Sequence, residues 1–166
     1  MSKKALDFAL VGRFDRKLDA TRRVRLPAEW FSLMGNPKSV VVLRDPGEKC
    51  LNLVSESVYA AQIKSLRRRS SKDVEAREEL RLLEGAVEHL AIDARHSIRI
   101  SDKLLSSAGI RDRVAFLGCV RYMKLWDPRV LSKAEADSEA KLEPGVWGSW
   151  GLTPLVGLSV VGFIPI

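Results

Sequence analysis

The chain has 166 residues, enough for one domain or two small ones, and its 46% hydrophobic and 30% charged residues exclude a disordered chain. Its 28 lysines and arginines outnumber its 21 aspartates and glutamates, and the net charge of +7 favours an anionic partner, nucleic acid before anionic lipid. Two distant cysteines exclude a disulfide framework and a cysteine-based zinc site, and the lack of nucleotide-binding and hydrolase motifs argues against an enzyme, a cofactor, a metal or a small-molecule substrate.

The first predicted unit covers residues 8–54 and has the element order β-β-α-β-β. Apolar and polar residues alternate over 8–18, which predicts a strand, and a turn over 19–22 leads to a second strand that ends at Leu26. Pro27 suits the first turn of a helix, and Gly35-Asn36-Pro37 ends it. Two short strands, 40–43 and 51–54, follow on either side of an Asp-Pro-Gly turn.

A helical connector is predicted over residues 55–83. Ser55 caps a first helix, and a second helix runs from about Asp73 to Leu83. The first helix ends in a basic run at 64–72, whereas 73–88 hold six acids and two bases. Two packed or salt-bridged helices explain this reversal of charge without any function.

The chain then repeats its first unit at an offset of 74 residues. The offset aligns Asp19 with Asp93, Val24 with Ile98 and the strand 40–43 with 114–117. The second unit therefore covers 84–126, with Ser101 as the cap of its helix. We expect a mainly β fold with short helices (α+β elements), built from two pseudo-symmetric β-β-α-β-β units.

Two further segments follow the second unit. A helix is predicted over 127–143, after Asp127-Pro128. Residues 144–166 then carry no charge but contain five Gly, three Pro and two Trp. This length reaches that of a membrane span, yet the Gly and Pro content disfavours a stable helix. We therefore expect a packed or disordered tail and no membrane partner.

Basic residues concentrate on the first predicted hairpin. Its alternation directs Phe14, Leu18, Val24 and Leu26 to a core. The opposite face and the turn then carry five candidate DNA contacts: Arg13, Lys17, Arg22, Arg23 and Arg25. A two-stranded ribbon fits the major groove of DNA, where arginine reads guanine with two hydrogen bonds. A solvated basic face without function is the alternative for such a run, but six bases within residues 12–25 favour binding.

The second hairpin offers weaker contacts. Arg95 and Arg99 are its candidates, but Ser97 stands at the position equivalent to Arg23. An aspartate that opens a turn accepts backbone N–H bonds, so Asp19 and Asp93 are predicted to fix the two turns, and Asp19 is also predicted to orient Arg23.

These motifs resemble the MraZ family of bacterial transcriptional regulators over residues 8–131. The resemblance rests on the Asp19 turn with Arg23, the partial copy at Asp93, and three short motifs: Cys50-Leu51-Asn52-Leu53, Leu83-Glu84-Gly85-Ala86 and Met123-Lys124-Leu125-Trp126. The sequence departs from the family at Ser97, and at Arg22 and His96, which stand where the family has glycine.

The resemblance implies two AbrB-like swapped-hairpin units of the double-split barrel type and a ring-shaped homo-oligomer. It also implies sequence-specific binding of double-stranded DNA at direct repeats, in a promoter of the division and cell-wall gene cluster, usually for repression. Because residues 1–7 lack the apolar core of a signal peptide, we expect a cytoplasmic, nucleoid-associated protein. Two alternatives stay open: an interaction protein that kept the fold, and a membrane-associated scaffold that uses the tail and the basic run at 64–72.

Overall fold

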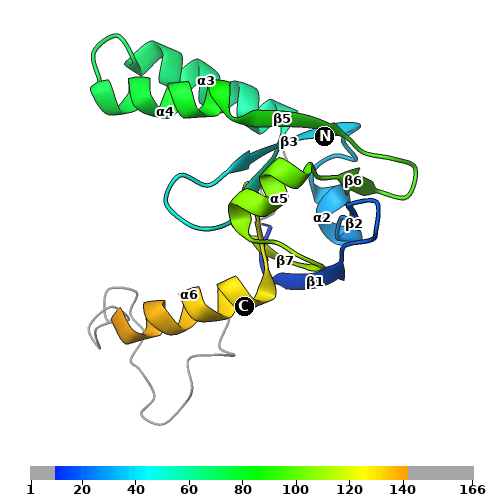
Figure 1. Cartoon of the computed structure of the whole chain (residues 1–166). Coiled ribbons are helices and arrows are strands. Elements are labelled where there is room, and N and C mark those ends of the chain that lie inside the picture. The colour runs from blue at the N-terminus through cyan, green and yellow to red at the C-terminus, as the bar shows by residue number, and fades with distance from the viewer. Residues whose placement is uncertain (1–9, 142–166) are drawn as a thin grey trace, which may run out of the picture.

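The computed structural model describes residues 10–141, and the predicted tail at 144–166 lies outside the described residues. The first copy contains β1 (Arg13–Lys17), β2 (Arg23–Arg25), α2 (Ala28–Leu33), β3 (Ser39–Arg44) and β4 (Leu51–Ser55). The connector contains α3 (Glu56–Arg69) and α4 (Val74–Gly85). The second copy and the last helix contain β5 (Val87–Ala91), β6 (Ser97–Arg99), α5 (Asp102–Ala108), β7 (Arg113–Gly118), β8 (Met123–Trp126) and α6 (Pro128–Lys141). The prediction of a mainly β fold with short helices is confirmed (Figure 1).

The strands form a six-stranded antiparallel sheet, in the order β1-β7-β8-β4-β3-β5, and a separate two-stranded ribbon of β2 and β6. This order is pseudo-symmetric, because exchanging each strand for its equivalent in the other copy reproduces it. The first strand of each copy pairs with the third strand of the other copy, and the two second strands pair with each other.

The predicted two-stranded hairpin of 8–18 with 23–26 is therefore wrong. A turn joins β1 to β2, but β1 pairs with β7 and β2 with β6. The alternation of apolar residues determines the face that each side chain occupies and does not determine the partner strand. Pairing along β1 also begins only at Arg13, apart from an isolated bridge between Leu10 and Val120.

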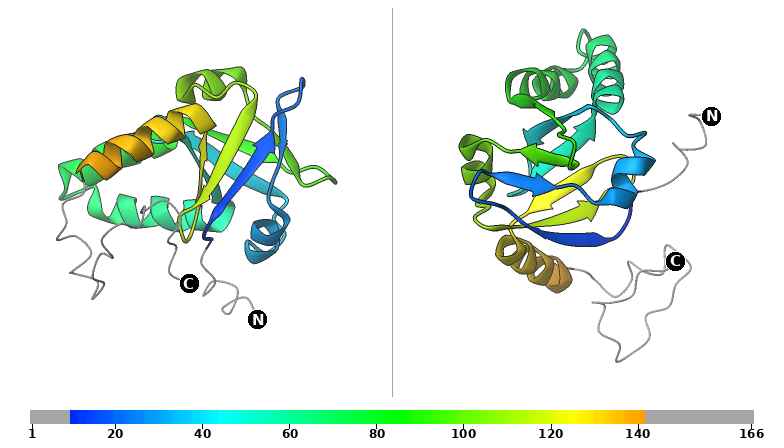
Figure 2. Two further views of the ribbon diagram at one scale, coloured as in Figure 1. Left: turned by 90° about the horizontal axis from the view of Figure 1, so that it is seen from below. Right: turned by 90° about the vertical axis from the view of Figure 1, so that its right-hand side faces the viewer.

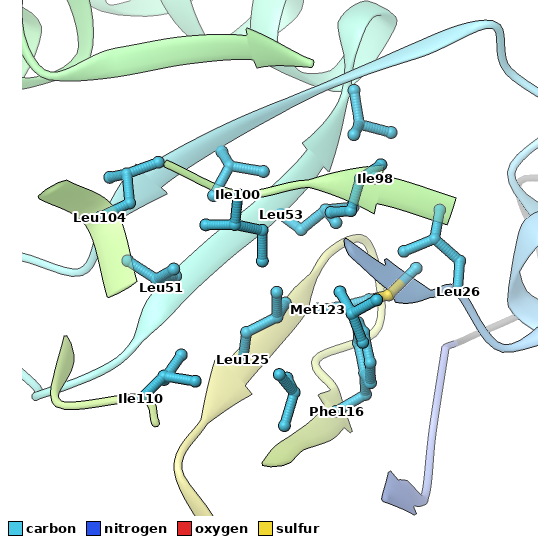
Figure 3. Close-up of a cluster of buried hydrophobic side chains, with 14 of the residues drawn as sticks. Leu26, Leu51, Leu53, Ile98, Ile100, Leu104, Ile110, Phe116, Met123 and Leu125 are labelled. Carbon is cyan, nitrogen blue, oxygen red and sulfur yellow. The ribbon is translucent and has the colours of Figure 1, made fainter. Parts of the chain in front are cut away.

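One hydrophobic core is shared by the two copies. It fills the space between the large sheet, the ribbon and the helices α2 and α5, and its buried residues come in equal numbers from the first and the second copy. Figure 3 shows Leu26, Leu51 and Leu53 of the first copy beside Ile98 and Phe116 of the second. Neither copy therefore closes a core by itself.

The opposite face of the sheet is covered by two other helices. Ala115 of β7 lies between the core residues Val114 and Phe116 and points to the opposite face. There it packs with Trp126 of β8 and Leu131 of α6. The helix α3 lies against β3 and β4. None of the helices within residues 10–141 is both long and apolar enough to cross a membrane.

The connector helices pack side by side, as their charges predict. Ser55 caps α3 by accepting the N–H of Val58 at 3.2 Å. Arg67 of α3 pairs with Glu84 of α4 at 3.0 Å, and the hydroxyl of Tyr59 donates to the carbonyl of Leu83 at 2.9 Å. The opposite charges of the two segments thus form part of a helix–helix contact.

Candidate nucleic-acid interface

Two equivalent turns flank the ribbon. Oδ1 of Asp19 accepts the backbone N–H of Thr21 at 2.8 Å and of Arg23 at 2.9 Å. Oδ1 of Asp93 accepts the equivalent N–H groups of Arg95 and Ser97, both at 2.9 Å. Each aspartate therefore closes its turn from the inside.

These hydrogen bonds hold both carboxylates in the ionised form. The N–H of Arg23 is the largest cause that lowers the pKa of Asp19, followed by the hydroxyl of Thr21. The N–H of Ser97 is the largest cause that lowers the pKa of Asp93. Both turns therefore keep a negative charge next to the arginines of the ribbon at neutral pH.

Arg22 and His96 occupy the left-handed positions of the two turns, with φ of 67° and 61°. This conformation costs a residue other than glycine about 1–3 kcal/mol, which explains why the resemblance places glycine here. The imidazole of His96 stacks on Phe31, with ring centroids 4.1 Å apart. The guanidinium of Arg22 pairs with Asp102 at 2.8 Å, a contact that the sequence pattern did not indicate.

The ribbon has one buried face and one basic face. Val24 lies opposite Ile98 in the ladder, and both side chains are buried in the shared core. Arg23 lies opposite Arg99, and Arg25 lies opposite Ser97, so three arginines project from the outer face. Like charges directly opposite each other in a ladder are destabilising, and a bound anion relieves this repulsion.

The guanidinium of Arg23 is held by the other copy. Its Nη1 lies 3.0 Å from Oδ2 of Asp93, and both side chains are about two-fifths exposed or less. Asp19, which is predicted to orient Arg23, accepts the backbone N–H of this residue, whereas Asp93 accepts from its guanidinium. Sequence spacing did not indicate the contact, since 70 residues separate the two side chains.

The structure brings most of the predicted contacts together and leaves one apart. Arg22, Arg23, Arg25, Arg95 and Arg99 lie on the ribbon or its turns, and Figure 1 shows these elements on one side of the molecule, opposite α3, α4 and α6.

Arg13 lies at the far end of β1 from the turn, about 13 Å from Lys17 at 3.3 Å per residue. Its Nε is paired with Asp15 at 2.8 Å, and this hydrogen bond raises the pKa of the guanidinium. Lys17 is exposed at the turn end of β1. Lys17 therefore lies next to the basic face of the ribbon, whereas Arg13 does not. The right-hand view of Figure 2 looks onto the side that carries the turns.

Asp45, Glu48 and Cys50 bring three possible metal ligands within 4.8 Å of one another. The ammonium of Lys124 already contacts Glu48 and lies 3.8 Å from Asp45. Burial raises the pKa of the Cys50 thiol to about 12, so this sulfur stays protonated. The lysine occupies the position that a cation would take, and we assign no metal site to this cluster.

The fold and the site define a class: a mainly β domain whose outer ribbon and turns present arginines, as in β-ribbon proteins that enter a DNA groove. The chain is 29% identical over 135 residues to "Transcriptional regulator MraZ" of Azorhizobium caulinodans, covering 80% of this chain and 85% of the relative. Similar proteins of that name occur in Tropheryma whipplei (28% over 131 residues, 78% and 89%) and Bacteroides fragilis (28% over 120 residues, 70% and 75%).

No family model matches the chain. The similarity to several proteins of one name nevertheless confirms the resemblance to the MraZ family that the motifs indicated. These relatives are named as regulators and not as enzymes, in agreement with the prediction of a non-enzymatic protein.

Proposed function

We propose that this chain is a DNA-binding transcriptional regulator that contacts double-stranded DNA with the basic face of the β2–β6 ribbon and its two turns. The observation that carries the proposal is the group of three arginines on the outer face of the ribbon, Arg23, Arg25 and Arg99. The names of the similar proteins support it independently.

The chemistry of the ribbon suits both kinds of DNA contact. A guanidinium donates two parallel hydrogen bonds to O6 and N7 of guanine, and Arg23 is our candidate for this contact because Asp93 limits its rotation. Phosphates between Arg23 and Arg99 relieve the repulsion of this pair, and Arg22, Arg95 and Lys17 extend the phosphate-binding surface. Phosphate contacts fix the register of the protein and make binding dependent on salt.

The two halves of the ribbon are chemically unequal. Arg23 in the first copy corresponds to Ser97 in the second, so only one half carries an arginine clamped by the opposite turn. We propose that one chain reads one half-site and that several chains bind direct repeats in a promoter. A ring-shaped homo-oligomer brings several weak contacts to adjacent repeats, and their effects combine through effective concentration. We further propose that the protein represses the division and cell-wall gene cluster and that it acts in the cytoplasm, at the nucleoid.

A selection experiment tests the proposal. The full chain is titrated by fluorescence anisotropy against a pool of random-sequence duplexes at two salt concentrations, and bound DNA is sequenced. We expect a short repeated motif to be enriched and its binding to weaken with salt. Arg23→Ala should weaken binding to this motif by about 1–3 kcal/mol, roughly 5- to 150-fold, as for one bidentate base contact.

Arg13→Ala is the matched control, because Arg13 is also an exposed arginine that pairs with an aspartate, but it lies outside the basic face. It should change affinity only slightly. Equal losses in both variants would contradict the assignment of Arg23 as a base reader. No binding at low salt would contradict the proposed function and favour a protein partner.

A further inference from the structure

A groove lies on the face of the sheet opposite the ribbon. Its cavity volume is about 930 Å³, within the range of roughly 300–1,000 Å³ that ligand sites have. Leu43, Asn52 and Val54 line it from the sheet, on the positions that alternate with the core residues of β3 and β4. Its walls come from α3 and α4 on one side and from the turn 119–122 between β7 and β8 on the other.

The groove is nearly free of charge. Among its lining residues only Glu79 and Arg121 are charged. Oδ1 of Asn52 is buried and accepts no hydrogen bond within residues 10–141, although Nδ2 of the same side chain donates to Asp45 at 2.9 Å. A buried acceptor without a donor is destabilising.

The rim of the groove exposes apolar surface in a strained turn. Val120 is 57% exposed, and its φ of 71° is unfavourable for a β-branched residue. Burial of such a side chain under a bound segment removes apolar area from water and stabilises the turn. These features fit an uncharged, apolar and extended segment of polypeptide.

We infer that residues 144–166 of the same chain occupy this groove. The segment contains no charged residue, and it includes Trp147 and Trp150 together with many aliphatic side chains. Its five glycines and three prolines disfavour a helix.

The position of α6 makes this assignment possible. The helix lies on the same face of the sheet as the groove and ends at Lys141. An extended chain advances about 3.3 Å per residue, so the 23 residues are long enough to reach back across the sheet. Leu10 bridges to Val120 at the rim, but the segment 1–9 that precedes it in the chain carries Lys3, Lys4 and Asp7 and fits an uncharged groove less well.

Cysteine cross-linking in the full chain tests the inference, because Cys119 lines the groove and is half-buried, whereas Cys50 is fully buried. Single cysteines are introduced into the tail as Ser149→Cys, Gly157→Cys and Gly162→Cys, and the proteins are oxidised with copper–phenanthroline. We expect one tail position to form an intrachain disulfide with Cys119, at least tenfold above Ser71→Cys in the turn between α3 and α4. Mass spectrometry of the digested protein identifies the bond.

A matched pair of blocking variants makes the test specific. Ala61→Arg places a charge in the groove wall on an exposed position of α3, and it should reduce the cross-link at least fivefold. Ala60→Arg, one residue earlier and outside this groove, should leave the yield unchanged. Circular dichroism checks that both variants are folded.

Three results would overturn the inference. A product of twice the chain mass assigns the groove to the tail of a second copy. A cross-link from Ala5→Cys with none from the tail assigns it to the N-terminal segment. No cross-link above the Ser71→Cys level means that the tail does not lie in the groove.

Discussion

A single substitution between the copies makes the two turns electrostatically different. Asp93 has two roles. Its Oδ1 accepts the backbone N–H groups of its own turn, and its Oδ2 binds the guanidinium of Arg23. Through the repeat Asp19 is the counterpart of Asp93 and Ser97 is the counterpart of Arg23, and a serine side chain cannot form the same ion pair. Arg23 is therefore held by the turn of the other copy, whereas Arg22 pairs with Asp102 of α5. Asp93 competes with any phosphate for the guanidinium of Arg23.

Asp93→Asn separates the two roles of Asp93. The amide oxygen still accepts the backbone N–H groups of the turn, but the negative charge beside Arg23 is lost. We expect binding to random-sequence duplex to strengthen several-fold, and the slope of log affinity against log salt to steepen by about 0.9, the value for one additional phosphate contact. Thermal stability should change little, because both side chains of the ion pair are partly exposed and solvent screens their attraction. Anisotropy titrations over a salt series measure both quantities.

Asp15→Asn is the control for this prediction. It removes the same charge and frees Arg13 from an equivalent ion pair, but it acts away from the ribbon. A gain in affinity equal to that of Asp93→Asn would mean that net charge alone is responsible and that the clamp has no special effect.

At the scale of elements, one close approach of two segments fixes the edge of the sheet. The backbones of Leu10 and Val120 exchange two hydrogen bonds of 2.9 Å, so the first described residues lie across the end of β7. A Cβ atom at Gly118 would lie 2.3 Å from the carbonyl oxygen of Leu10. Only glycine allows this approach.

Gly118→Ala should therefore lower the free energy of unfolding by about 1–3 kcal/mol, the usual cost of forcing extra atoms into a packed site. Gly85→Ala is the control, because nothing lies within 4 Å of a Cβ at this position and its φ is not positive. It should leave stability unchanged or raise it by about 0.4–1 kcal/mol. Urea unfolding of both variants measures the difference, and equal stabilities would show that the segment at Leu10 moves away freely.

Local patterns in the sequence predicted the elements and the equivalence of the two copies but not the strand partners, and only the resemblance to a family of swapped hairpins implied an exchange. The offset of 74 residues aligned Asp19 with Asp93 and Val24 with Ile98, and the structure shows each pair in equivalent surroundings. Local patterns identify a strand and its buried face. The choice between pairing within a copy and pairing across copies depends on the total core that each arrangement closes, and no local pattern carries that information. The ion pair of Arg23 with Asp93 follows from the exchange and was missed for the same reason.

At the scale of the whole molecule, the exchange of strands makes the two copies one cooperative unit. At each edge of the sheet a strand of one copy pairs with a strand of the other: β1 with β7, and β5 with β3. The ribbon likewise contains one strand from each copy. The residues of the shared core come equally from both copies. A unit that has lost its partner would expose open sheet edges and half a core, so neither copy is expected to remain folded alone.

Two equivalent core variants test this cooperativity. Leu26 and Ile100 correspond through the repeat, and their side chains are 1% and 0% exposed. Leu26→Ala and Ile100→Ala should each lower the free energy of unfolding by about 2–5 kcal/mol, because each leaves a cavity in the same core. Differential scanning calorimetry should show a single transition for both variants, with equal calorimetric and van't Hoff enthalpies. If instead one half melted early while the other kept the wild-type midpoint, the copies would be separate domains, because a shared core cannot lose half of its residues and leave the other half intact.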